Sequence, residues 1–222
     1  MKKLGAFLAG VGLLASATFA ADSNTATSVN IVGFQKITCP RGQLVMVSTA
    51  FKSLDGAPLK SANVFSNQLP EGSFVYAWSA VSNKYLIDDI DLEGWRENIT
   101  YEGKMGFWIR VPATADSNSY DVVMSGEVPM NEYVTNNIYP GLNMFGFPYT
   151  ASVLWTNTSL AKNAQGGDWL YIWTGSGYNS YTMDLEGWGD ANSVIINPGT
   201  AFWFRSISGS VSTYIENRPY NP

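Results

Sequence analysis

The sequence contains no histidine and only one cysteine, Cys39, among its 222 residues. The absence of imidazole excludes Ser-His-Asp and Cys-His catalysis, His-based metal sites and imidazole general-base chemistry. A lone cysteine excludes an internal disulfide, so Cys39 is interpreted as a small buried residue, with a free thiol for pairing with another chain as the alternative. Mechanisms that use only carboxylates, such as glycoside hydrolysis, stay open.

Charge is also scarce. Charged residues make up 14% of the chain, and the net charge is −5. An acidic chain without a basic patch repels nucleic acid and anionic lipid, so neither is expected as a partner. Aromatic residues also make up 14%, and this composition indicates a packed domain and not a disordered chain.

A long apolar run occurs only at the N-terminus. Residues 1–20 begin with Lys2 and Lys3, continue with a short apolar core and end in a stretch of small residues. This pattern predicts a bacterial signal peptide, followed by a short linker over residues 21–27. The apolar run is too short to span a bilayer, so no membrane insertion is expected after cleavage. The predicted location is secreted, cell-surface or periplasmic.

The rest of the sequence repeats itself. Similar or identical blocks recur in the same order, at residues 72–78 and 167–173, 91–95 and 184–188, and 106–110 and 201–205. The middle pair is the identical pentapeptide Asp-Leu-Glu-Gly-Trp. The blocks predict two tandem modules related by internal duplication, over residues 28–127 and 128–222.

Each module is expected to consist of strands and turns. Runs rich in β-branched and aromatic residues predict strands at residues 29–37, 44–51, 74–78, 84–87, 107–111, 120–124, 142–147, 169–173, 178–183, 202–207 and 212–215. A short helix is predicted within residues 151–164, capped by Asn157 or Thr158. The fold class is therefore all-β, with two tandem antiparallel β-sandwich or small β-barrel modules, packed either as separate beads or as one pseudo-symmetric unit.

The repeated pentapeptide contains the candidate metal ligands. Asp89, Asp91 and Glu93 alternate in the first copy, so in extended backbone their carboxylates would share one face. Oxygen ligands on one face suit Ca²⁺, although the second copy has Thr182 at the position of Asp89. A tight turn that depends on Gly94 and Gly187 is the favoured interpretation of the motif, and the calcium site is the alternative.

Eight tryptophans and twelve tyrosines raise the question of sugar binding, because flat rings stack on pyranoses. Trp155 and Trp169 occur only in the second copy, and Tyr178 and Tyr181 follow its hairpin turn. These four residues are the candidate exposed, ligand-binding aromatics. Tryptophans at matching positions of the two copies are interpreted as core, namely Trp78, Trp108, Trp173 and Trp203.

Arg110 and Arg205 each follow a Phe-Trp pair, with one residue between the pair and the arginine. We interpret both as stacking on neighbouring rings or pairing with a carboxylate, with ligand contact as the alternative.

The second copy also carries a recognisable pattern. Its elements are residues 141–149 (Gly-Leu-Asn-Met-Phe-Gly-Phe-Pro-Tyr), 171–173 (Tyr-Ile-Trp) and 198–203 (Pro-Gly-Thr-Ala-Phe-Trp). This pattern resembles a tandem β-module of secreted, uncharacterised proteins in Verrucomicrobia, Planctomycetes and Bacteroidetes-type bacteria. The first copy departs from it, with Ser48-Thr-Ala50 where Gly-x-Pro would stand. The resemblance implies an exported β-module and transfers no functional residue.

Three functions follow as hypotheses. The first is a non-catalytic exported protein with a structural, adhesive or self-assembly role, whose partner is another copy of itself. The second is a pair of carbohydrate-binding modules that use exposed aromatics on an extracellular glycan. The third is a carboxylate-only glycan hydrolase, which is disfavoured because the one repeated acidic motif is the same in both copies, whereas a catalytic pair needs two different environments. No enzyme activity and no cofactor are expected.

Overall fold

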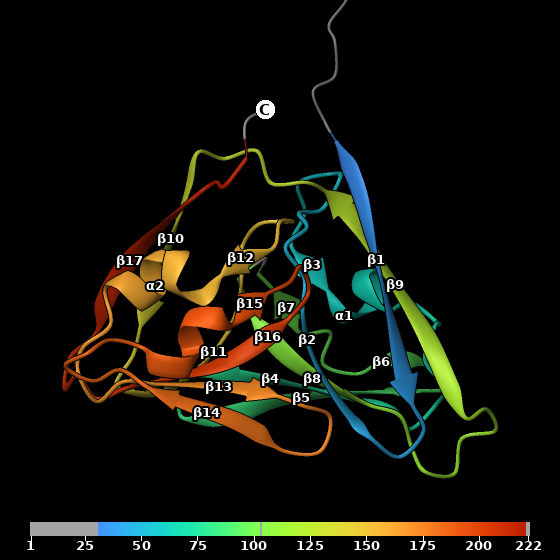
Figure 1. The fold of residues 1–222 in the computed structure, drawn as a ribbon. Helices are drawn as coiled ribbons and strands as arrows, with labels where there is room; N and C mark the ends of the chain where they lie inside the picture. The colour runs from blue at the N-terminus through green and yellow to red at the C-terminus, as the bar shows by residue number, and fades with distance from the viewer. Residues whose placement is uncertain (1–30, 103, 221–222) are drawn as a thin grey trace, which may run out of the picture.

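The computed structural model describes residues 31–102 and 104–220 (Figure 1). Strands account for 49% of the described residues and helices for 8%. The sheets are antiparallel, and none of those in the described part is closed. The prediction of an all-β protein is thus confirmed, whereas no closed barrel is found over these residues. The expected signal peptide and linker lie outside the described residues.

The first half of the chain forms a five-stranded sheet, a two-stranded ribbon and a short strand pair. The sheet has the order β2-β8-β4-β5-β6, the ribbon is β1-β9, and the pair is β3-β7. The elements are β1 (Val32–Pro40), β2 (Leu44–Ser48), β3 (Leu59–Lys60), α1 (Ser61–Val64), β4 (Phe74–Ser79), β5 (Lys84–Asp91), β6 (Gly94–Trp95), β7 (Thr100–Tyr101), β8 (Gly106–Arg110) and β9 (Ser119–Glu127).

The second half follows the same plan. Its sheet has the order β11-β16-β13-β14, its ribbon is β10-β17, and its short pair is β12-β15. The elements are β10 (Tyr133–Ile138), β11 (Gly141–Gly146), β12 (Val153–Leu154), η1 (Trp155–Asn157), α2 (Ser159–Lys162), β13 (Trp169–Trp173), β14 (Tyr178–Thr182), η2 (Gly189–Ser193), β15 (Ile195–Ile196), β16 (Ala201–Ser206) and β17 (Ser212–Asn217).

The core of the first half lies between its sheet and its ribbon. Val75 on β4 and Ile109 on β8 point inward from the sheet and are fully buried, as is Val122 on the ribbon. Every second residue of each strand faces this core because successive side chains alternate across a pleated strand. Cys39 on β1 belongs to the same core, and burial raises the pKa of its thiol to about 12.

The core of the second half is built in the same way. Leu170 on β13 and Phe204 on β16 are fully buried, and Tyr214 packs against them from the ribbon. The predicted helix is present as α2, and its cap is Thr158, whose hydroxyl accepts a hydrogen bond from the backbone N–H of Ala161.

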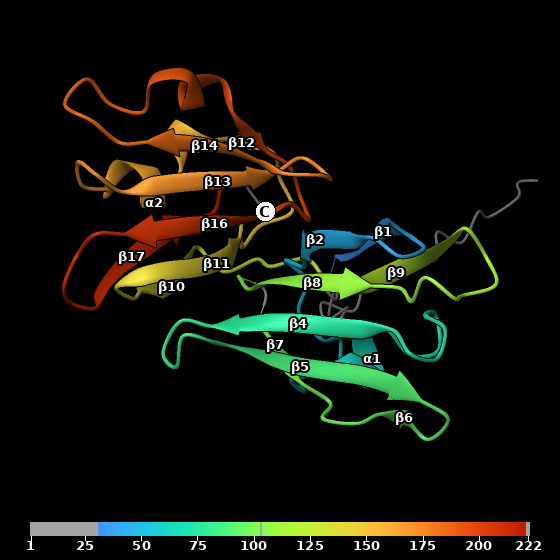
Figure 2. The ribbon, with the colours of Figure 1, turned by 90° about the horizontal axis from the view of Figure 1, so that it is seen from below.

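The two halves pack against each other and are not separate beads. The two large sheets lie side by side when the molecule is seen from below (Figure 2). The N–H of Ser48 donates to the carbonyl of Gly199, and the N–H of Gly146 donates to the carbonyl of Lys104, both at 2.9 Å. Two isolated bridges flank these bonds, Val47 with Thr200 and Met105 with Phe145. These two hydrogen bonds and two bridges form matched pairs, in which corresponding strands of the two halves exchange roles.

Within residues 31–102 and 104–220, no helix has the length and apolar character needed to cross a membrane.

Candidate binding site: an aromatic face across both halves

The outer face of the first sheet carries a row of aromatic rings. On β4, Phe74, Tyr76 and Trp78 are partly exposed, while the intervening Val75 and Ala77 are buried. The rings of Phe74 and Tyr76 stack, with centroids 6.0 Å apart and an interplanar angle of 18°. The pleat therefore sorts the aliphatic side chains to the core and the rings to the outer face.

The second sheet repeats this row. On β13, Trp169, Tyr171 and Trp173 are partly exposed and Leu170 is buried. The rings of Trp169 and Tyr171 stack, with centroids 6.0 Å apart and an interplanar angle of 12°. Both sheets thus present a row of three rings on the same kind of surface.

The two rows meet where the halves pack. Trp78 lies edge-to-face against Trp203 of β16 at 5.5 Å, and Trp108 of β8 lies edge-to-face against Trp173 at 5.2 Å. The indole N–H of Trp78 also donates to the carbonyl of Leu142 across the junction, at 2.8 Å. Edge-to-face packing is a favourable arrangement for aromatic rings, so these contacts fix the orientation of the two sheets.

Two tyrosines stand at the rim of the junction. Tyr85 of β5 and Tyr178 of β14 are 42% and 43% exposed. The hydroxyl of Tyr178 accepts a hydrogen bond from the indole N–H of Trp203 at 3.0 Å. Partial burial raises the pKa of both phenols. A hydrogen bond with Trp108 at Tyr85, and one with Trp203 at Tyr178, lowers the pKa and partly opposes this increase. Each phenol stays neutral near pH 7 and can donate a hydrogen bond to a ligand.

These residues enclose an open groove. Its volume is about 490 Å³, which falls within the range of roughly 300–1,000 Å³ typical of ligand pockets. Its walls come from both halves, namely Tyr85, Leu142, Tyr171, Tyr178, Trp203 and Arg205. No carboxylate lines it among the described residues. We define this set as the aromatic groove.

Two arginines lie on the same face at matching places. Arg110 of β8 is opposite Phe74, and Arg205 of β16 is opposite Trp169. Both side chains are exposed. Neither arginine takes part in an ion pair over the described residues, so the expected pairing with a carboxylate is not found there.

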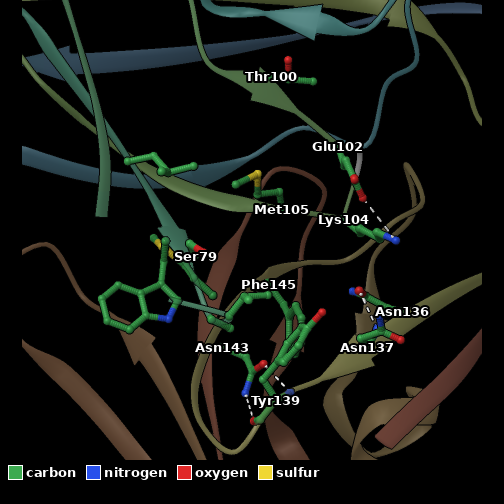
Figure 3. A pocket seen from close by; sticks show the side chains of 15 residues that line it. Ser79, Thr100, Glu102, Lys104, Met105, Asn136, Asn137, Tyr139, Asn143 and Phe145 are labelled. Atoms are coloured by element: carbon green, nitrogen blue, oxygen red, sulfur yellow. Dashed lines mark hydrogen bonds and ion pairs between the residues drawn. The ribbon is translucent and has the colours of Figure 1, made fainter. Parts of the chain in front are cut away.

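A second cavity, of about 350 Å³, lies between the halves (Figure 3). Its polar groups are largely occupied by the protein itself. The side-chain amide of Asn143 donates to the carbonyls of Tyr139 and Gly141 at 2.8 and 3.0 Å. The ammonium of Lys104 pairs with Glu102 at 3.2 Å and donates to the carbonyl of Thr135 at 3.1 Å. Groups that already bond to the protein offer little to a ligand, so this cavity is the weaker candidate.

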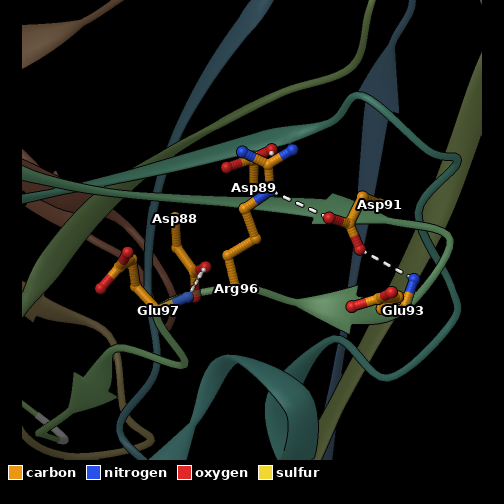
Figure 4. A network of polar contacts seen from close by, with 6 residues as sticks. All are labelled: Asp88, Asp89, Asp91, Glu93, Arg96 and Glu97. Carbon is orange, nitrogen blue, oxygen red and sulfur yellow. Dashed lines mark hydrogen bonds and ion pairs between the residues drawn. The ribbon is translucent and has the colours of Figure 1, made fainter.

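The acidic cluster of the first half does not form the candidate calcium site (Figure 4). Arg96 lies between two of the carboxylates, with its Nε 3.3 Å from Asp89 and 2.9 Å from Asp91. The pKa of Asp91 is lowered mainly by a hydrogen bond from the backbone N–H of Glu93, and to a smaller extent by a hydrogen bond from the side chain of Arg96. Over the described residues no group of three or more His, Cys, Asp or Glu side chains could hold a metal. The interpretation of Asp89, Asp91 and Glu93 as calcium ligands is therefore wrong, because an internal cation already occupies the position between the carboxylates.

The repeated pentapeptide forms the same turn in both halves. In the second half the carboxylate of Asp184 accepts the N–H of Glu186 at 2.8 Å, as Asp91 does for Glu93. The glycine of each turn has a positive φ, 113° at Gly94 and 106° in its counterpart, which is a conformation that favours glycine. The repeated spacing thus serves the turn.

The most buried carboxylates bind backbone. Asp88 accepts the N–H groups of Glu97 and Ile99. Asp168 accepts those of Gln165 and Ile207. A carboxylate held by two backbone donors fixes a loop and is not free to act as an acid or base in the groove.

The four aromatic candidates from the sequence fall into two groups. Trp169 and Tyr178 lie on the outer aromatic face, as expected. Trp155 is completely buried in the second core, 5.0 Å from Trp188, so its interpretation as an exposed ring is wrong. Tyr181 packs against the same core, because it lies three residues after Tyr178 on β14 and so faces the opposite side of the strand.

Other residues of the groove were assigned differently by sequence reasoning. Trp203 was interpreted as core and is indeed only 6% exposed, yet one side of it lines the groove. Tyr85 and Tyr171 had no assigned role. The alternation of rings on β13 is the sequence signal that points to Tyr171, whereas Tyr85 lies on β5 and has no such signal.

Searches against protein-family models and against curated proteins find no match to this chain.

Proposed function

We propose that the protein is a non-catalytic, exported glycan-binding protein that holds a polysaccharide along its aromatic face. The observation that carries the proposal is the aromatic groove, in which Tyr85, Tyr178 and Trp203 converge from both halves. Flat rings beside phenol hydroxyls suit a pyranose, which offers an apolar face and a rim of hydroxyls.

The lining of the groove favours binding over hydrolysis. Glycoside hydrolysis usually needs an acid and a base carboxyl on the two sides of the scissile bond. The six residues that line the groove include no aspartate or glutamate. A hydrolase is therefore the weaker alternative.

An exported location is part of the proposal. It rests on the signal-peptide pattern of residues 1–20 and on the resemblance to secreted β-modules.

Internal duplication is also part of the proposal. It is supported by the equal strand order of the two large sheets, β2-β8-β4-β5 and β11-β16-β13-β14. The matched Trp78–Trp203 and Trp173–Trp108 contacts add to this support. A duplicated fold would bring two aromatic rows to one surface without a separately evolved site.

Removing the rim tyrosines tests the function. Tyr85→Ala with Tyr178→Ala is expected to weaken glycan binding at least about tenfold, because the loss of well-packed aromatic anchors typically costs more than 1.4 kcal/mol. The matched control is Tyr133→Ala, an exposed tyrosine on the ribbon strand β10. Calorimetric titration with a panel of neutral and acidic polysaccharides measures the effect. The absence of binding to every member by the native protein would reject the proposal.

A second candidate function is self-assembly in the cell envelope. It is favoured by the outer side of the β1-β9 ribbon, where Val32 is 59% and Phe34 is 76% exposed. Phe34→Asp is expected to abolish any concentration-dependent oligomer without altering glycan binding. Sedimentation velocity over a wide concentration range measures this. A native protein that stays monomeric at the highest concentration would exclude self-assembly.

A further inference from the structure

We infer that the preferred ligand of the aromatic face is a uronic-acid polysaccharide, whose carboxylates pair with Arg205 and, less strongly, with Arg110. This inference rests on the proposed function and narrows its ligand to one chemical class.

Arg205 is placed as an anion anchor inside the groove. It lines the groove with Tyr171 and Trp203, and its side chain is exposed. Its sheet neighbours on either side are Leu142 and Trp169, neither of which carries charge. A guanidinium with no carboxylate beside it keeps its fork of donors available, and that fork matches a planar carboxylate in a two-point contact.

The first half carries a weaker version of the same anchor. Arg110 lies opposite Phe74, as Arg205 lies opposite Trp169. Phe74, however, also lies opposite Asp89 on β5, whereas the residue opposite Trp169 on β14 is Thr182. Arg96 pairs with the carboxylate of Asp89. Even so, the negative charge of Asp89 makes the surface around Arg110 less attractive to an anion than the surface around Arg205. The second half is therefore the stronger anchor.

The overall charge favours a uronate over a more densely charged chain. The protein has a net charge of −5, so a polymer with several sulfates per sugar is repelled more strongly than a polymer with a single carboxylate per sugar. The groove itself holds one arginine, Arg205, so it offers a pairing partner to a single carboxylate. The rings beside each arginine would stack on the sugar whose carboxylate it binds.

Titration with three soluble polymers tests the inference. Polygalacturonate is expected to bind more tightly than neutral glucomannan and than λ-carrageenan, a sulfated polymer with more charge per sugar. Arg205→Gln is expected to weaken polygalacturonate binding roughly tenfold, as for the loss of a charge-assisted hydrogen bond, and Arg110→Gln by less. Arg205→Gln is expected to weaken binding of polygalacturonate much more than binding of glucomannan, because only the uronate offers a carboxylate to the guanidinium. Lys60→Gln, which removes one positive charge from the exposed Lys60 of β3, is the control and is expected to have no effect.

The outcomes separate this inference from the proposed function. The inference is overturned if the protein shows no preference for polygalacturonate and Arg205→Gln has no effect. The proposed function still stands in that case, provided that glucomannan binds and its binding depends on the rim tyrosines. Tighter binding of carrageenan overturns the choice of uronate. No binding of any polymer overturns both.

Discussion

Gly146→Val is expected to lower the free energy of unfolding by about 3 kcal/mol or more. Gly146 ends β11 at the junction of the halves, and a Cβ on it would overlap the side chain of Ser48 from the other half. Its N–H must also stay within reach of the carbonyl of Lys104, to which it donates at 2.9 Å. The added side chain cannot be accommodated unless the sheets separate.

Chemical denaturation measures this effect, and near-ultraviolet circular dichroism reports whether the tryptophan pairs of the junction persist. Gly209→Ala is the control, because a Cβ at Gly209 has no heavy atom within 4 Å. A Gly146→Val protein as stable as the native one, with an unchanged spectrum, would contradict the packing of the halves described above.

Trp155→Ala is expected to destabilise the protein by about 4 kcal/mol. Trp155 is completely buried, and its ring contacts Trp188 at 5.0 Å and Phe202 at 5.5 Å. Truncation would leave a cavity at the centre of the second core, which the surrounding rings cannot fill.

Trp155→Phe is expected to cost much less than Trp155→Ala. The indole Nε1 of Trp155 is buried without a hydrogen-bond partner, and an unpaired buried donor costs about 1–3 kcal/mol. Phenylalanine removes this donor and keeps most of the ring contacts. Thermal unfolding of both variants measures the difference. Equal destabilisation by the two substitutions would show that ring packing at this position contributes little.

Local signals predicted much of the fold from the sequence. The hairpin of β13 and β14 was expected from its glycine-rich turn, and Gly175 does adopt a positive φ of 96°. A helix cap at Asn157 or Thr158 was expected from the preference of these residue types for helix starts, and Thr158 provides it. Both signals act over a few residues, so neighbouring parts of the chain do not alter them.

Strand β10 had no predicted counterpart. It contains Thr135, Asn136 and Asn137 in sequence, and asparagine is depleted in strands. Pairing with β17 overrides this local preference: the side-chain amide of Asn136 bonds to the hydroxyl of Tyr214.

The site was less predictable than the fold. The groove combines Tyr85 from the first half with Tyr178 and Trp203 from the second, and no local pattern indicates that these rings meet. Trp155 was misjudged because its occurrence in one copy only suggested a surface role. It instead fills the second core, which a lone tryptophan can do as readily as a repeated one.

The most direct test of the central claim is a crystal structure of the protein with a uronic-acid hexasaccharide. The account predicts a sugar ring in the aromatic groove, in contact with Tyr171, Tyr178 and Trp203, with a carboxylate on Arg205. A saccharide bound instead in the cavity beside Lys104, or on the ribbon strands, would contradict it.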